Sequence, residues 1–176
     1  MIVIGLLGAI ALIVIAAINP IEQANRARDT RFKSDAGQLI SAIDRYFAAN
    51  SEFPWMTLDG NIDADDELTF VSASDESIGL CGATCSADGS LITTNELKTE
   101  FRNRDFISAT TADKQIWVGK DGGASASVYA CFVPLSKSER AKTENLVSLT
   151  FDANGAPTEC STTDWVTSPC YVCLPQ

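Results

Sequence analysis

The first fifty residues constrain this chain more than any other part of it. Residues 1–18 form an unbroken apolar run, MIVIGLLGAIALIVIAAI, with no charged or hydrogen-bonding side chain. Asn19 and Pro20 end the run, and an amphipathic stretch follows as far as Asn50. As a helix, the run would span about 27 Å, close to the roughly 30 Å hydrocarbon core of a bilayer. The sequence therefore predicts a membrane-type helix joined to a second helix that packs on a folded head.

Residues 21–50 have the spacing of a helix with one buried face. Apolar residues recur at steps of three and four, and charged residues fill the opposite face. The apolar set is Ile21, Ala24, Phe32, Ala36, Leu39, Ile43, Tyr46 and Phe47; the polar set is Arg26, Asp29, Lys33, Asp44 and Arg45. We expect the helix to end near Asn50, before Phe53 and Pro54.

Three roles compete for the apolar run. A cleaved secretory signal would need a basic segment first, and none precedes Ile2. A core helix of a globular protein is rarely so uniformly apolar. A membrane anchor fits best, and we expect the recorded chain to begin inside a longer anchor. Pro20, which lacks a backbone N–H, should break or kink the helix at the membrane edge.

Small residues recur along the apolar run, at Gly5, Gly8, Ala9 and Ala16. Such residues are ordinary in membrane helices, and they also let two helix backbones approach closely. Both interpretations remain open for these four positions.

The charge of the chain is strongly negative and unevenly spread. The net charge is −10, residues 1–20 carry none, and residues 21–35 carry four basic against three acidic side chains, which leaves −11 for residues 36–176. Nucleic-acid binding needs a basic surface, so we expect no direct nucleic-acid partner. The sequence contains no histidine, which removes the commonest general base, and we predict that the protein is not an enzyme.

All six cysteines lie in the head. An even number behind a membrane segment favours disulfides formed outside the cytoplasm. Spacing favours Cys81 with Cys85 and Cys170 with Cys173, which leaves Cys131 with Cys160; a rival pairing joins Cys160 with Cys170. Zinc binding is the other use of such spacing, but export and the absence of histidine argue against it.

A candidate calcium loop begins at Asp59. Asp59, Asn61, Asp63 and Asp65 have the D-x-N-x-D spacing that places oxygens around Ca²⁺. Ala64 stands where such a loop needs glycine, and Phe70 stands where it needs a bidentate glutamate. A solvated acidic loop is therefore the expected structure, and we predict no cofactor, with calcium as the alternative.

The rest of the head reads as short strands and turns. We expect a loop-rich segment over residues 51–90, a capping box at 93–96 that leads into a short helix to 103, and extended segments at 106–107 and 115–120. A turn at 120–123 should lead into a central strand at 125–133. A second capping box at 136–139, a strand at 146–151 and a turn at 152–155 complete an antiparallel sheet with one face open to the long helix.

Several motifs follow one another in a fixed order. They are the apolar run, Ala-Ile-Asn-Pro at 17–20, a segment of mixed charge at 26–35, and Tyr46 shortly before Asn50 and Pro54. This order resembles the N-terminal region of type IV pilins and of the pseudopilins of type II secretion systems. The resemblance implies a pilin-like α+β fold, in which a long N-terminal helix packs on an antiparallel sheet of about four strands, with a disulfide-bearing C-terminal region. Gly8 and Pro20 match the helix-weakening residues of that family.

One departure from the family pattern is large. Pilins have a leader that ends in glycine and a mature sequence that starts like Phe-Thr-Leu-Ile-Glu, and neither is present here. Met1 corresponds to a position just past that glutamate. We expect that the recorded sequence starts at an internal methionine.

The resemblance also implies a function. Residues 1–20 would be the membrane and filament-core half of the helix, residues 21–50 the half that packs on the head, and residues 51–176 an extracellular head. We expect a subunit of a pilus-like filament or a periplasmic pseudopilus, anchored in the inner membrane before assembly, with other copies of itself and the assembly machinery as partners. Adhesion, motility, DNA uptake and secretion all use such filaments. The alternative is a non-polymerising, membrane-anchored extracellular binding module that binds calcium.

Overall fold

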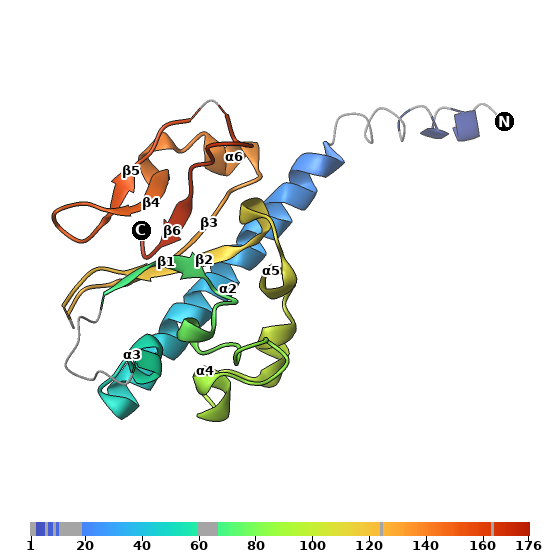
Figure 1. Ribbon diagram of the computed structural model, residues 1–176. Coiled ribbons are helices and arrows are strands. Elements are labelled where there is room, and N and C mark those ends of the chain that lie inside the picture. The colour runs from blue at the N-terminus through green and yellow to red at the C-terminus, as the bar shows by residue number, and fades with distance from the viewer. Residues whose placement is uncertain are drawn as a thin grey trace.

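One long helix crosses a head built from a small sheet and short helices, as the computed structural model of the protein shows (Figure 1). The structure describes residues 3–5, 7–8, 10, 19–59, 67–123, 125–162 and 164–176. The helices are α2 (Pro20–Asn50), α3 (Pro54–Asp59), α4 (Ser90–Thr93), α5 (Asp105–Ser108) and α6 (Lys137–Arg140). Short 3₁₀ helices are η1 (Glu76–Ile78), η2 (Thr99–Asn103), η3 (Ala112–Lys114) and η4 (Thr143–Asn145). The strands are β1 (Leu68–Ser72), β2 (Ile116–Lys120), β3 (Val128–Phe132), β4 (Val147–Phe151), β5 (Pro157–Glu159) and β6 (Val172–Leu174).

The main sheet has four antiparallel strands in the order β1-β2-β3-β6. This confirms the predicted α+β class and the predicted sheet size. β3 lies between β2 and β6, as expected for the central strand. The predicted strand at 146–151 does form, but as β4 it pairs with β5 in a separate two-stranded sheet.

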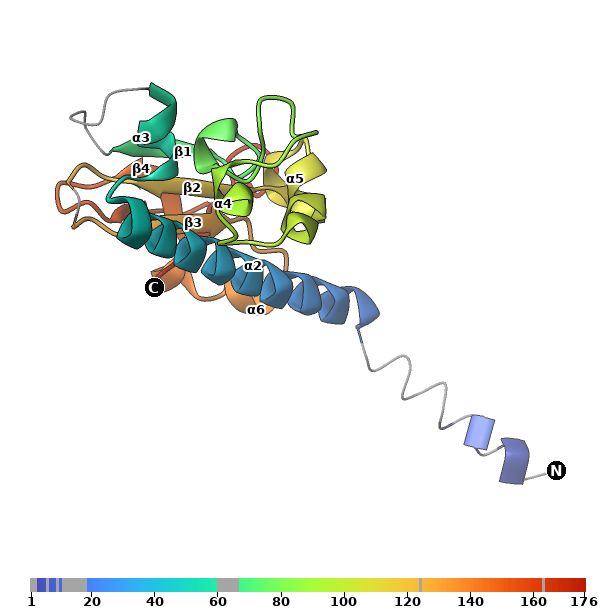
Figure 2. The same ribbon diagram turned by 90° about the horizontal axis from the view of Figure 1, so that it is seen from below.

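The buried face of α2 packs on β3 and β6. Its buried apolar residues are Phe32, Ala36, Leu39, Ala42, Ile43 and Tyr46, so the predicted apolar face is confirmed from Phe32 onward. It is wrong at the start of the helix, because Ile21 is 72% exposed and Ala24 is also exposed. The head contacts only one side of the first turns of α2, where Glu22 and Asn25 bond residues 135–137, and the start of the helix lies at the edge of the head (Figure 2). Among the described residues, every buried side chain lies at or after Asp29, so a fragment of residues 19–176 keeps every residue that the structure describes as buried.

Aromatic rings connect α2 with the elements on either side of it. The Phe32 ring meets Phe106 of α5 edge-on at 6.1 Å and Phe132 of β3 at 5.7 Å. The extended segment predicted at 106–107 is instead the helix α5, with both residues buried. Placing Phe106 on a helix lets its ring reach Phe32, and this tertiary contact outweighs the local β preference of Phe and Ile.

The capping box predicted at 93–96 is also wrong. α4 ends at Thr93, and Asn95 has a φ of +64°, a left-handed conformation that terminates a helix. The chain then turns back, so that the N–H of Leu97 donates to the carbonyl of Leu91 at 2.9 Å. In place of the predicted α-helix to residue 103, the 3₁₀ helix η2 (Thr99–Asn103) forms. The second predicted capping box forms in part: Ser136 Oγ accepts from the N–H of Glu139 at the start of α6, but the Ser136 N–H donates to Asp29 and not to Glu139.

The β4–β5 sheet packs against the main sheet through aromatic rings. Phe151 of β4 stacks on Phe70 of β1 at 4.7 Å. The Phe70 ring in turn covers Gly119 of β2, where a Cβ would lie 2.7 Å from the ring. Gly119 is therefore needed because only a hydrogen fits beneath the ring.

Three disulfides join the six cysteines, as Cys81–Cys85, Cys131–Cys173 and Cys160–Cys170. The prediction of Cys81 with Cys85 is confirmed, and the rival pairing of Cys160 with Cys170 is the one that forms. The preferred pairings of Cys170 with Cys173 and Cys131 with Cys160 are wrong. The sheet explains why: β3 and β6 are neighbours, and their register sets Cys131 opposite Cys173.

Candidate functional site at the junction of helix and head

The first turns of α2 meet the head at the loop between β3 and α6, residues 133–136. The helix begins where the sequence predicts a boundary. Asn19 has an extended backbone and its Oδ1 accepts a hydrogen bond from Glu22 N–H at 3.2 Å, while Pro20 occupies the first helical position. The cap fixes the start of α2, so that the side chains one and two turns later are presented to this loop.

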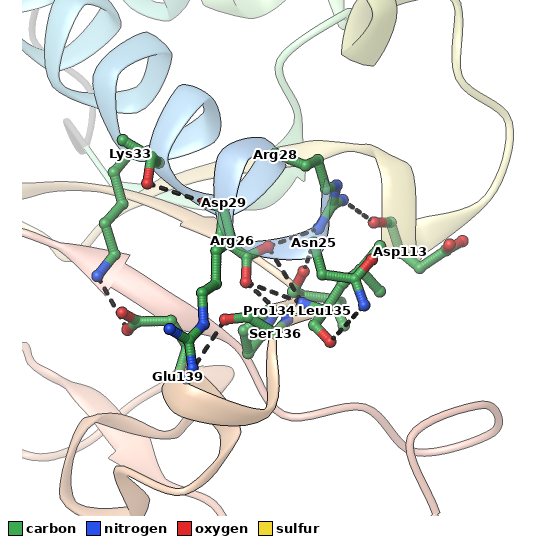
Figure 3. Close-up of polar contacts among 12 residues, drawn as sticks. Asn25, Arg26, Arg28, Asp29, Lys33, Asp113, Pro134, Leu135, Ser136 and Glu139 are labelled. Carbon is green, nitrogen blue, oxygen red and sulfur yellow. Dashed lines mark hydrogen bonds and ion pairs between the residues drawn. The ribbon is translucent and has the colours of Figure 1, made fainter. Parts of the chain in front are cut away.

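Asp29 is the central residue of the junction (Figure 3). Its side chain is buried, and its carboxylate accepts hydrogen bonds from the backbone N–H of Leu135 at 3.1 Å and of Ser136 at 2.8 Å. Arg28 Nη1 lies 3.2 Å from the same carboxylate. A buried carboxylate is stable only when such partners replace water. The prediction that Asp29 lies on the solvent face of the helix is therefore wrong.

Arg28 and Asn25 bind the carbonyl groups of the same region. Arg28 Nη1 donates to the Val133 carbonyl at 2.8 Å, Arg28 Nη2 donates to the Asp113 carbonyl, and Asn25 Nδ2 donates to the Leu135 carbonyl at 3.3 Å. None of these carbonyls lies in a strand: those of Val133 and Leu135 belong to irregular chain, and that of Asp113 belongs to η3. Side chains of α2 thus supply the hydrogen bonds that a sheet would otherwise supply.

An outer ring of charged contacts surrounds the buried ones. The Glu22 carboxylate accepts from Lys137 N–H at 3.1 Å, and Lys33 Nζ lies 2.9 Å from Glu139 Oε2. The Lys137 N–H lowers the pKa of Glu22. Burial opposes ionisation of Glu139, but hydrogen bonds and charge from Lys33 and Lys142 outweigh burial and lower its pKa. Both carboxylates are therefore held in the charged state that their partners need.

Sequence reasoning missed the junction, although one signal was available. Asp29 stands three residues before Phe32, and Phe32 stands four before Ala36. The same steps continue along the buried face, so the apolar stripe extended backward predicts that position 29 is buried. A charged residue in line with a buried stripe calls for polar partners on the opposing element.

The apolar residues that precede Asn19 form the second part of the candidate site. Val3, Ile4, Leu7 and Ile10 are 53–72% exposed. Gly5 and Gly8 have helical backbone, and a Cβ on either would meet no described atom within 4 Å. Ala9 and Ala16 lie outside the described residues. Within the described ranges, no helix has both the length and the apolar character that crossing a membrane requires.

The calcium loop cannot be placed. Asp59 is the last residue of α3, but its side chain lies outside the described residues, as do Asn61, Asp63 and Asp65. In the part of the chain that the structure describes, no three carboxylate or cysteine side chains gather as a metal site would require. Calcium binding stays a prediction about this loop.

No protein-family model, characterised protein or solved structure matches the chain. The donors and acceptors of the junction pair with one another across two elements. The arrangement is suited to holding α2 and the head in one fixed orientation, while apolar side chains before Asn19 remain uncovered.

Proposed function

We propose that the protein is a structural subunit of a type IV pilus-like filament or a type II secretion pseudopilus, and that it assembles through its apolar N-terminal segment. The single observation that supports this most directly is that the head packs on one part of the N-terminal region and leaves apolar residues of another part exposed. The core of the head uses α2 only from Asp29 onward. Among the described residues, Val3, Ile4, Leu7 and Ile10 are 53–72% exposed, and in this proposal lipid or other copies cover them.

Burial of the apolar segment supplies the driving force for assembly. Each large apolar side chain that leaves water contributes roughly 1.5–3 kcal/mol. Before assembly, the inner membrane covers this segment. After assembly, the helices of neighbouring copies replace the lipid, and the small residues Gly5 and Gly8 allow those helices to approach closely.

The junction at Asp29 couples the head to the helix that assembles. Since α2 and the head are joined by these hydrogen bonds, the orientation of α2 in a helical array also fixes the orientation of the head. The head is displayed on the outside of the filament, and its three disulfides fit a compartment outside the cytoplasm. In this proposal the protein acts as a building unit, with other copies and the assembly machinery as its partners.

The proposal is tested by expressing the full-length gene with its assembly machinery and imaging sheared filaments. We expect filaments that contain this chain, and we expect Ala16→Glu to abolish them because it places a charge among apolar helices. The matched control is Ala141→Glu, on the exposed position after α6, which should assemble normally. Protease resistance of the head checks that both variants fold. If Ala16→Glu assembled as well as the control, the apolar segment would not be the assembly element.

A further inference from the structure

A groove of about 840 Å³ runs along the outer face of α2. Its floor is formed by short side chains of the helix, Ser34, Gly37 and Ser41, and its wall by residues 96–104, which lie beside α2 (Figure 2). Arg45 closes one end, where its guanidinium bonds both the carboxylate and the carbonyl of Glu96 at 2.8 Å. The bonds between Arg45 and Glu96 thus hold the floor and the wall of the groove together.

Gly37 is the feature of this groove that the chain itself does not explain. Glycine in the interior of a helix costs about 0.5–1 kcal/mol relative to alanine. A Cβ on Gly37 would meet no described atom within 4 Å, and Gly37 has no left-handed φ that would require glycine. Packing within the chain therefore gives no reason for glycine here. A neighbouring molecule that approaches the helix backbone closely would give one.

The rim of the groove is rich in cations. The Lys98 side chain is exposed, and it has no hydrogen-bond or ion-pair partner within the described part of the chain. Arg104 is held loosely, with Nη1 3.7 Å from the buried Asp35. Arg45, Lys98 and Arg104 face two acidic residues, Glu96 and Glu100. These five charged side chains sum to +1, on a chain whose net charge is −10.

The opposite charge is found at another part of the same molecule. Two neighbouring turns, residues 121–123 and 152–156, lie at the end of the head away from Asn19 in both views (Figures 1 and 2). We call them the acidic turns, because they carry Asp121 and Asp152. They adjoin, since a Cβ on Gly155 would lie 2.7 Å from Asp121 Oδ2. The nearby Lys120 is fully buried and points its ammonium at backbone carbonyls of the first turn.

We infer that the groove along α2 receives the acidic turns of a second copy of this chain. The inference rests on the proposed filament function and assigns it a second contact, separate from the apolar segment. The groove along α2 and the acidic turns are two different surfaces of opposite charge. A contact between them is therefore heterologous, since each copy contributes a different surface. Contacts of that kind build open polymers, whereas a patch that pairs with itself closes a dimer.

The contact is tested directly with a photo-crosslinking amino acid in place of Lys98, in the full-length chain expressed with its assembly machinery. Irradiation should join two copies, and mass spectrometry should find the adduct on a peptide that contains residues 121–123 or 152–156. The same probe in place of Glu144, an exposed residue near α6, is the control and should give no such adduct. Adducts on any other segment, on another protein, or on none would overturn the inference.

Substitution of Gly37 gives a second, independent readout. Gly37→Leu should fill the groove and reduce filament yield by about tenfold, the factor expected for roughly 1.4 kcal/mol of lost contact. The folded head should be unaffected, as judged by protease resistance, because nothing described opposes a side chain there. Ala141→Leu, on an exposed position after α6, is the matched control. Normal filaments from Gly37→Leu would refute the groove contact and leave the filament function intact; the absence of wild-type filaments would refute the function itself.

Discussion

The Asp29 carboxylate accepts a hydrogen bond from the backbone N–H of Ser136 at 2.8 Å, across 107 residues of sequence. Ser136 is also the residue that caps α6. One buried carboxylate on the long helix therefore fixes the start of a short helix in the head. The head and the helix form one unit because this contact is satisfied on both sides.

Asp29→Ala should destabilise the fragment of residues 19–176 by roughly 2–4 kcal/mol. The substitution leaves the N–H groups of Leu135 and Ser136 buried without an acceptor, and each such loss costs about 1–3 kcal/mol. Urea denaturation followed by circular dichroism measures the change. Asp44→Ala, at an exposed position of the same helix, should stay within about 0.5 kcal/mol of wild type. Equal unfolding midpoints for the two variants would show that the junction does not stabilise the head.

Phe32→Ala should cost about 3–5 kcal/mol, the range for deletion of a buried aromatic side chain. Phe32 is 2% exposed and contacts Phe106 and Phe132 edge-on. Removing it opens a void between α2, α5 and β3. The control is Ile21→Ala, where the side chain is 72% exposed and little change is expected in the same denaturation experiment. A loss below about 1 kcal/mol for Phe32→Ala would contradict the packing described here.

The three disulfides should differ in their effect on stability in the order of their loop lengths. The separations are 42 residues for Cys131–Cys173, 10 for Cys160–Cys170 and 4 for Cys81–Cys85. Loop-closure entropy then predicts losses of about 4, about 2.7 and about 2 kcal/mol when each pair is replaced by alanines. Thermal and chemical unfolding of the three double variants tests the ranking. A larger loss from the 81–85 pair than from the 131–173 pair would show that chain entropy is not the dominant effect.

Two glycines should respond to alanine with opposite signs. Gly119→Ala places a methyl group against the Phe70 ring, where a Cβ would lie 2.7 Å away, and should destabilise the head by about 1–3 kcal/mol. Gly37→Ala removes a flexible residue from the interior of α2 and should stabilise it by about 0.5–1 kcal/mol. Each variant serves as the control for the other in denaturant titrations. A stabilising Gly119→Ala would mean that the Phe70 ring does not cover β2.

The stability of the head should carry a measurable pH dependence from Asp35. Burial raises the pKa of Asp35, and the charges of Arg104 and Arg31 only partly offset this. Between the ordinary carboxyl pKa and the raised one, the folded state binds more protons than the unfolded state. The free energy of unfolding therefore falls as pH rises through that window. Asp35→Asn should gain stability relative to wild type above the window and lose that advantage below it.

Glu22→Gln is the control of opposite sign for this experiment. The Lys137 N–H lowers the pKa of Glu22, so its contribution is present above the ordinary carboxyl pKa and is lost as pH falls through the lowered one. Urea titrations of both variants and wild type across acidic to neutral pH measure the differences. A difference between Asp35→Asn and wild type that stays constant with pH would contradict the assignment.

The elements that follow from local pattern were predictable from the sequence. The apolar steps from Phe32 to Tyr46 indicate α2, and the alternation around Val128 indicates β3, because the pattern and the buried face coincide there. Residues 106–107 were predicted to be extended but belong to the helix α5. The contact that favours the helix, between Phe106 and Phe32, is made across 74 residues of sequence. Local preference cannot register a contact of that kind.

The junction and the disulfides depend on which segments become neighbours. Cys131 pairs with Cys173 because β6 lies beside β3. The segment 172–174 is too short for its sequence pattern to predict a strand. Asp29 is buried because an irregular loop more than 100 residues later in the chain presents two N–H groups to it. In both cases the partner is specified by topology, which spacing along one chain does not contain.

The place of β6 in the sheet has a consequence for how the protein is made. β6 comes after every other element in the sequence, yet it completes the sheet beside the central strand β3. A head that emerges from a membrane N-terminal end first stays open along β3 until residues 172–174 have crossed. For the exported subunit proposed above, folding would thus follow export in time: translocation would finish before the head closes, and only a closed head would be added to a filament.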